Sequence, residues 1–174
     1  DVSYHQGVIN WEKVKNTGKV DFAIIRCGYG MNEWNETTQT WTQDDPQWEY
    51  NTSECERLNI PYGVYLYSYA DTTEKAKSEA EHVIRMLEGK NLSYPIYYDM
   101  EDKSVMNNSK ITAAKASQIA QTFLNTMKAA GYNNLGVYSS KYYFETKLTA
   151  SVFNQYPKWV AQYSNSCTYK KNYQ

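Results

Sequence analysis

The chain has 174 residues, enough for one domain with a substantial core and too few for two ordinary domains. Its 18 basic and 19 acidic residues give a net charge of −1, so no electrostatic field favours nucleic acid or an anionic membrane as a partner. No apolar run approaches the roughly 20 residues that span a bilayer. We therefore expect a single domain over residues 1–174 that is monomeric and does not insert into membranes.

The predicted elements alternate between strands and helices along the whole chain. Short apolar runs predict strands, and apolar residues at helical spacing predict helices. In order, they are a short strand at 1–3, a helix at 11–15, a strand at 21–27, a long polar loop at 31–45, a helix at 46–58, a strand at 61–68, a helix between the capping-box spacing of 71–74 and Gly89, a strand at 94–99, a helix at 111–130, a strand at 135–138, a helix at 141–147 and a strand at 158–163.

Cysteine and histidine usage argues against a disulfide framework and against a metal site. Cys27, Cys55 and Cys167 are odd in number and widely spaced, and Cys27 is typical of a small core residue in its strand. His5 and His82 lie far apart in the sequence, so we expect no metal and no cofactor. His82 is expected on the surface, because its helix is rich in Glu and Lys. His5 follows Asp1 closely, which makes it a candidate for contact with a ligand or an acid.

Aromatic content is the unusual feature of the composition, with 18 Tyr and 5 Trp. Such rings combine an apolar face with a polar tip, and sugar rings stack on surfaces of this kind. At the end of the chain, Lys170 and Lys171 are typical of a solvated turn.

The alternation of strands and helices predicts a parallel sheet with helices outside it. A Rossmann-type sheet would need a glycine-rich phosphate turn, and neither GxGxxG nor GxxxxGK[ST] occurs. A (β/α) barrel fits better, because polar or aromatic residues follow each strand, and the C-terminal strand ends form the active face of such barrels. These residues are Asp1, Arg26, Tyr29, Tyr67, Asp99, Glu101, Tyr138, Gln162 and Tyr163.

The stretch from Tyr94 to Asp102 is the strongest candidate for an active centre. It begins as a buried strand and ends with Asp99 and Glu101, two residues apart. Residues i and i+2 of a strand point to one side, which places the two carboxyl groups roughly 6.5–7 Å apart. A neighbouring charge can keep one carboxyl group protonated for acid/base work. The alternative is that the strand simply ends in water at this point.

Several segments resemble glycoside hydrolase family 25 lysozymes, in the order in which the family carries them. They are residues 1–11 (DVSYHQGVINW), 21–26 with 28–30 (DFAIIR, GYG), 63–70 (GVYLYSYA), 95–101 (PIYYDME), 131–132 with 136–138 (GY, GVY) and 159–163 (WVAQY). The resemblance implies an α/β fold, an irregular TIM-like (β/α)5β3 barrel. It also implies cleavage of the β-1,4 bond between N-acetylmuramic acid and N-acetylglucosamine in bacterial peptidoglycan glycan strands.

The resemblance also implies roles for individual residues. Glu101 would be the general acid, with its pKa raised by neighbouring acids and aromatic walls. Asp99 would be ionised and would orient the 2-acetamido group of the sugar or steer water, while Asp1 would tune the other two acids. The expected spacing of the two carboxyl groups lies at the low end of the range for inverting glycosidases, so spacing leaves the stereochemistry open. The family is usually discussed as retaining, with the substrate's acetamido group as nucleophile. The substrate-binding candidates are Tyr29, Tyr67, Tyr138, Trp159, Gln162, Arg26 and His5.

Family members usually continue into one or two further strands and a further acidic residue of the cleft. The sequence ends at Asn172–Gln174, about where those strands would begin, so we expect the chain to be part of a longer one whose C-terminal strand or strands are missing here. The expected location is secreted or in the cell wall, or release by a phage as an endolysin.

Three other functions stay open at this level. A non-catalytic glycan-binding module on the same fold would use the aromatic residues and not the acids. A chitinase-like hydrolase also carries D-x-E, although its longer D-G-x-x-x-D-x-D-x-E run is absent, with Pro95 and Tyr97 before Asp99. A nucleotide-binding enzyme is the weakest alternative, for lack of a phosphate loop.

Overall fold

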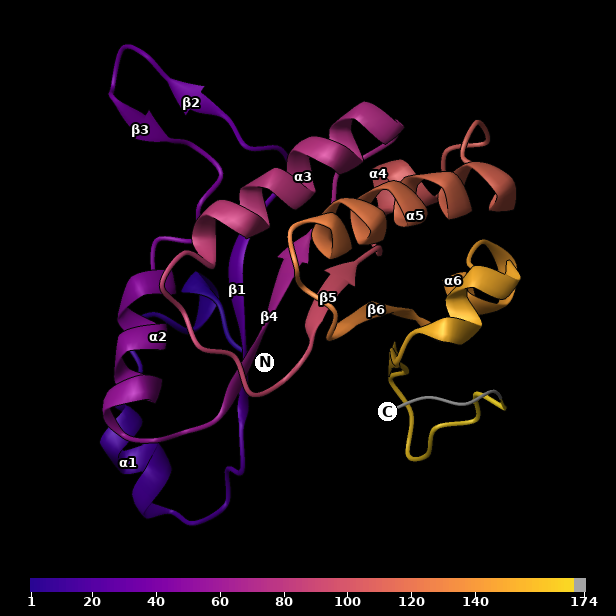
Figure 1. Ribbon diagram of the computed structural model, residues 1–174. Coiled ribbons are helices and arrows are strands. Elements are labelled where there is room, and N and C mark those ends of the chain that lie inside the picture. Colours follow the sequence, from indigo (N-terminus) through magenta and orange to yellow (C-terminus); the bar gives the residue numbers. More distant parts are fainter. Residues whose placement is uncertain (171–174) are drawn as a thin grey trace.

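A five-stranded parallel sheet forms the centre of the computed structural model, which describes residues 1–170 (Figure 1). The strands are β1 (Ala23–Tyr29), β4 (Tyr62–Tyr67), β5 (Ile96–Asp99), β6 (Leu135–Ser140) and β7 (Lys158–Ala161), and they lie side by side in that order. Each new strand is added next to the preceding one, as repeated βα units with short connections require. This arrangement confirms the predicted fold class, a parallel α/β sheet of the barrel-like type.

The helices pack around the outside of the sheet (Figure 1). They are α1 (Trp11–Asn16), α2 (Trp48–Arg57), α3 (Thr73–Met86), α4 (Lys103–Met106), α5 (Ala113–Ala129) and α6 (Lys141–Thr146), with the 3-10 helices η1 (Tyr4–Gln6) and η2 (Ser151–Gln155). On the helical side, the Tyr98 ring stacks on Phe123 of α5 with centroids 3.9 Å apart. Within the described residues, no helix has the length and apolar character needed to cross a bilayer.

Apart from the first strand, the predicted helices and strands are present, with small shifts at their ends. The N-cap of α3 is Thr72 and not Asp71, because the Thr72 hydroxyl accepts from the Lys75 N–H and Asp71 instead pairs with the Lys75 ammonium at 2.8 Å. Lys170 is exposed, and Lys171 lies outside the described residues.

The long polar loop predicted at 31–45 contains a β-hairpin. Strands β2 (Trp34–Asn35) and β3 (Thr40–Trp41) pair in antiparallel fashion and extend away from the sheet (Figure 1). The rings of Trp34 and Trp41 meet edge to face, with centroids 5.2 Å apart. Cross-strand aromatic pairs stabilise short hairpins of this kind.

His82 lies in the core, and the prediction that it is on the surface is wrong. Its Nε2 is 2.8 Å from Asp44 Oδ1, and its Nδ1 is 3.1 Å from the Gly30 carbonyl oxygen. These partners arrive when the segment after β1 folds back over α3. A buried imidazole is tolerated because both ring nitrogens are hydrogen-bonded.

The predicted first strand is reduced to a single bridge. Val2 pairs with Ile25 on the outer side of β1, through hydrogen bonds of 2.9 Å to the Ile24 carbonyl and from the Arg26 N–H. This bridge fixes Asp1 beside the sheet. Among the described residues, no hydrogen bonds join β7 back to β1.

Candidate active site

One row of residues crosses the whole sheet at the C-terminal ends of its strands. Tyr29 is in register with Tyr67, Tyr67 with Asp99, Asp99 with Tyr138, and Tyr138 with Trp159. All five had been predicted as site residues from their separate positions along the sequence. Because the strands are parallel and in register, residues about 130 positions apart meet on one edge of the sheet.

Aromatic side chains from neighbouring strands pack around Trp159, next to this row. The Trp159 ring contacts Tyr138, Tyr97 and Tyr65, with centroids 4.6, 5.3 and 6.3 Å apart. Gly136 makes room for this packing, since a Cβ there would lie 2.5 Å from the Tyr97 ring. Trp159 therefore forms both part of the site and part of its supporting layer.

Asp99 and Glu101 line the same small cavity and differ in exposure. Asp99 is 2% exposed, and no hydrogen bond reaches its Oδ1 from the described residues. Glu101 is half-buried and accepts a hydrogen bond from the Tyr138 hydroxyl. Burial raises the pKa of Glu101, the charge of Asp102 acts in the same direction, and the Tyr138 hydrogen bond opposes them.

The surroundings of Asp99 disfavour the ionised form that the family resemblance implies for it. Burial raises the pKa of Asp99 well above its ordinary value, and the Glu101 charge raises it further. The positive charge of Arg26 acts in the opposite direction. Two neighbouring carboxyl groups in a site of low polarity do not ionise easily together. The surroundings of the pair therefore favour a protonated form.

Asp102 connects the site to the helix that follows. Its Oδ1 caps α4 by accepting from the Ser104 and Val105 N–H groups, and its Oδ2 accepts from the Tyr67 hydroxyl at 3.2 Å. Tyr67 is thus held by a carboxylate that is itself held by a helix end. Sequence reasoning missed this role, although its signal was present in the capping residue Asp102 directly after the D-x-E strand.

Arg26 is held from the side opposite the acids. Its Nε donates to Asp45 Oδ2 at 2.8 Å, and Asp45 also accepts from the N–H groups of Tyr4 and Gln47. The guanidinium lies over the Tyr4 ring, 4.8 Å from its centroid, and near Tyr29 at 5.7 Å. Asp45 is buried, so this ion pair joins β1, η1 and the start of α2 into one rigid wall.

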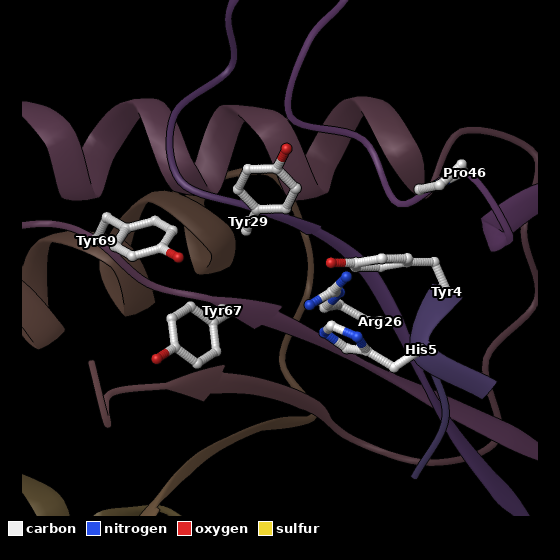
Figure 2. Close-up of a pocket in the computed structure, with 7 residues that line it drawn as sticks. All are labelled: Tyr4, His5, Arg26, Tyr29, Pro46, Tyr67 and Tyr69. Atoms are coloured by element: carbon white, nitrogen blue, oxygen red, sulfur yellow. The ribbon is translucent and has the colours of Figure 1, made fainter. Parts of the chain in front are cut away.

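Two adjoining cavities open along this edge of the sheet. The first, of about 700 Å³, is lined by Tyr4, His5, Arg26, Tyr29, Pro46, Tyr67 and Tyr69, and Figure 2 shows their side chains facing a common space. The second, of about 300 Å³, is lined by Asp1, His5, Arg26, Tyr65, Tyr67, Asp99, Glu101, Tyr138, Trp159 and Tyr163. Because His5, Arg26 and Tyr67 line both, the two cavities adjoin, and we refer to them together as the cleft.

Of the predicted site residues, Gln162 alone lines neither cavity. Its side-chain amide instead accepts from the Thr168 N–H at 2.8 Å and donates to the Ser164 and Thr168 hydroxyls. Gln162 thereby organises the segment after β7. The cleft residues that the sequence did not single out are Tyr4, Pro46, Tyr65 and Tyr69.

The described residues contain no group of three or more His, Cys, Asp or Glu side chains placed to hold a metal ion. Asp99 and Glu101 are close in space to aromatic rings and to Arg26, and the chemistry that this donor set offers is proton transfer.

The family model of "Glycosyl hydrolases family 25" matches residues 1–174. The chain belongs to this family. Among solved structures, the modular autolysin LytC from Streptococcus pneumoniae superposes with a TM-score of 0.85 at 36% identity, covering 99% of this chain and 39% of LytC. LytC has also been solved in complex with a synthetic peptidoglycan ligand, at 35% identity and a TM-score of 0.85.

Two further relatives of this family 25 chain are more distant. A family 25 glycosyl hydrolase from Bacillus anthracis shares the fold, with a TM-score of 0.80 at 15% identity over 99% of this chain and 74% of that one. The uncharacterized protein YegX of Escherichia coli K12 is 23% identical over 167 residues, 94% of this chain. The chain spans 55% of the length of YegX and 39% of that of LytC.

Proposed function

We propose that residues 1–174 form the catalytic domain of an N-acetylmuramidase, which cleaves the β-1,4 bond between N-acetylmuramic acid and N-acetylglucosamine. The observation that carries this proposal is the pair Asp99 and Glu101 in one cavity, both with raised pKa values, at the centre of an aromatic cleft. Membership of family 25 and the peptidoglycan ligand of LytC support peptidoglycan as the substrate. The expected place of action is the bacterial cell wall, from outside the cell or after phage release.

Glu101 is the general acid in this proposal. Burial raises its pKa, which favours the protonated form that a general acid needs, and its half-buried side chain lines the second cavity, where a glycosidic oxygen can approach it. Transfer of its proton to that oxygen breaks the bond to the leaving sugar. The same group then takes a proton from the water that enters, which restores Glu101 for the next cycle.

Asp99 acts on the substrate's 2-acetamido group. Its buried, unpartnered Oδ1 is an acceptor for the acetamido N–H. With the N–H held, the acetamido carbonyl oxygen attacks the anomeric carbon as the leaving oxygen departs, and water later opens the ring so formed. Asp1, which lines the same cavity, adds a third carboxyl group that tunes the other two. Two inversions at the anomeric carbon give overall retention.

Product analysis tests the proposal. Purified peptidoglycan is digested, the new reducing ends are labelled by borohydride reduction, and the reduced sugar is identified after acid hydrolysis. We expect reduced muramic acid, and NMR of the first product formed should show the β-anomer. Reduced glucosamine would instead make the protein a glucosaminidase, and an initial α-anomer would contradict acetamido participation.

A further inference from the structure

We infer that Arg26 determines the specificity of the cleft for muramic acid, by donating a hydrogen bond from Nη2 to an oxygen of the lactyl group on the sugar's O3. This inference rests on the proposed function and names the group of the substrate that the first cavity binds. Muramic acid differs from glucosamine only by this lactyl ether. A residue that binds it would separate peptidoglycan from chitin.

Nη2 of the Arg26 guanidinium has no hydrogen-bond partner among the described residues. The side chain is 9% exposed, its Nε is paired with Asp45, and Nη2 is buried without a hydrogen-bond partner. An unpaired buried N–H is costly, so the position favours a ligand that brings an acceptor. Arg26 lines both cavities, and Figure 2 shows its guanidinium between the side chains of Tyr4 and His5 in the first one.

The distribution of charge along the cleft orients the ligand. The second cavity is lined by three carboxyl groups, those of Asp1, Asp99 and Glu101. The lining of the first cavity contains no carboxyl group, and its only permanent cation is Arg26. Since Arg26 lines both cavities, the difference between them is in the carboxyl groups, and a lactyl oxygen with a full or partial negative charge is better accommodated on the side of Arg26 that faces the first cavity.

The donor is also fixed in place before any ligand arrives. Asp45 holds Nε on one side, and the ring of Tyr4 lies against the guanidinium plane. A preorganised donor loses little conformational entropy on binding. A site that is built to hydrogen-bond a group discriminates strongly against a substrate that lacks it, because its polar atom then stays unpaired.

Two forms of the lactyl group present such an oxygen. Where the stem peptide has been removed, the group ends in a carboxylate, and where the peptide is attached, it ends in an amide carbonyl. The carboxylate would bind more strongly, since hydrogen bonds between charged groups are roughly twice as strong as neutral ones.

The experiment measures kcat/KM of the wild type, Arg26→Gln and Arg26→Lys on three glycans: peptide-free peptidoglycan strands, peptide-bearing strands and chitin oligosaccharides. Arg26 also lowers the pKa of Asp99, so its removal is expected to affect all substrates to some degree. The ratio of the muramyl rate to the chitin rate removes this common effect. The exposed Arg57→Gln is the matched control.

We expect the wild type to prefer muramyl strands, and Arg26→Gln to reduce that preference about 10- to 100-fold, the range for one hydrogen bond to a charged group. Arg26→Lys, which keeps the charge but not the planar fork, should lose most of the same preference. A larger effect on peptide-free strands would identify the carboxylate as the ligand, and equal effects would identify the carbonyl.

An unchanged ratio in Arg26→Gln, or a wild type that cleaves chitin and muramyl strands equally, would overturn the inference. Failure of the wild type to cleave any muramyl strand would instead contradict the proposed function. If Arg26→Gln does not fold, binding of the same glycans is measured by calorimetry. The two proteins compared are Glu101→Gln and the double variant Glu101→Gln with Arg26→Lys. The ratio of their affinities for muramyl strands and chitin then replaces the ratio of rates.

Discussion

The Tyr138 hydroxyl donates a hydrogen bond to Glu101, and the two residues come from neighbouring strand ends. The bond stabilises the ionised form of Glu101, so it lowers a pKa that burial has raised. Tyr138 also packs against Trp159. The proposed acid is therefore positioned by the same aromatic layer that supports the cleft.

Tyr138→Phe should move the alkaline limb of the pH–kcat/KM profile to higher pH. The phenylalanine ring keeps the packing but removes the donor, so the pKa of Glu101 rises and the acid stays protonated further into the alkaline range. Rates measured on peptidoglycan between pH 4 and 9 check this shift. A limb that moves to lower pH would contradict the assignment of Glu101 as the acid.

Asp99→Asn should gain stability relative to the wild type as the pH rises from 4 to 8, by about 1.4 kcal/mol for each unit by which the folded pKa of Asp99 exceeds the unfolded one, because asparagine has no carboxyl group to ionise in the buried site. The folded pKa of Asp99 lies above its unfolded value, so its contribution is fully present below the ordinary carboxyl pKa of about 4 and is lost as the pH rises through the folded value. Asparagine has no proton to lose, so its contribution to the free energy of unfolding does not change over that pH range.

Urea unfolding at pH 4 and pH 8 measures this difference. The advantage of Asp99→Asn should grow with pH, while Asp21→Asn, which removes a charge at an exposed position, should show no such trend. An advantage that shrinks between pH 4 and pH 8 would contradict the raised pKa.

Glu79→Gln should cost about 1–3 kcal/mol of stability and weaken glycan binding. The buried Glu79 carboxylate accepts from the Tyr98 and Ser68 hydroxyls and from the Tyr69 N–H, at 2.6, 2.7 and 2.8 Å. Glutamine replaces one acceptor by a donor, so one of these groups is left unpaired. Since Tyr69 lines the first cavity, its loosening should raise KM.

Glu81→Gln, at an exposed position of the same helix, is the control for Glu79→Gln. Denaturant midpoints and KM on peptidoglycan are compared for the two variants. Equal midpoints would show that the buried carboxylate does not hold the segment after β4.

Gly28→Ala should destabilise the protein by about 1–3 kcal/mol, as overpacking in a core does. A Cβ at this position would lie 2.5 Å from His82 Cε1 and 2.6 Å from the Gln43 carbonyl oxygen. The backbone oxygen cannot turn away, so the segment after β1 must shift. Ser53→Ala, at an exposed position of α2, is the control, and a Gly28→Ala midpoint equal to the control's would refute this packing.

The sheet and the row of residues at its C-terminal edge were predictable because their signals are local. Apolar runs mark each strand, and the residue after each run is placed by the strand's own end. Parallel pairing then brings these ends into one row, so that Asp99, Tyr138 and Trp159 meet without any long-range information beyond the βα order.

The features that were missed depend on where loops fold. The helix around His82 is rich in Glu and Lys, and nothing local shows that Asp44 and Gly30 cover its imidazole from 38 and 52 positions away. The burial of Asp45 against Arg26 is of the same kind. Gln162 follows a strand as the site residues do, but the segment after it supplies hydrogen-bond partners, which turn its amide away from the cleft.

The direction of the pKa shift of Asp99 could not be predicted from the sequence for a different reason. The D-x-E spacing shows that two acids share a face, but not which of them is more buried. Asp99 is 2% exposed and Glu101 is half-exposed, and this difference decides where the desolvation cost falls.

The release of new reducing ends from purified peptidoglycan by Glu101→Gln tests the central claim most directly. Glu36→Gln, an exposed substitution in the hairpin loop, is the matched control. Removal of a general acid should lower kcat by about 10²- to 10⁴-fold, with glycan binding and the denaturant midpoint close to those of the control. Turnover by a folded Glu101→Gln within a few-fold of the control would contradict the account, because the cleft would then hydrolyse glycan without the acid on which the mechanism depends.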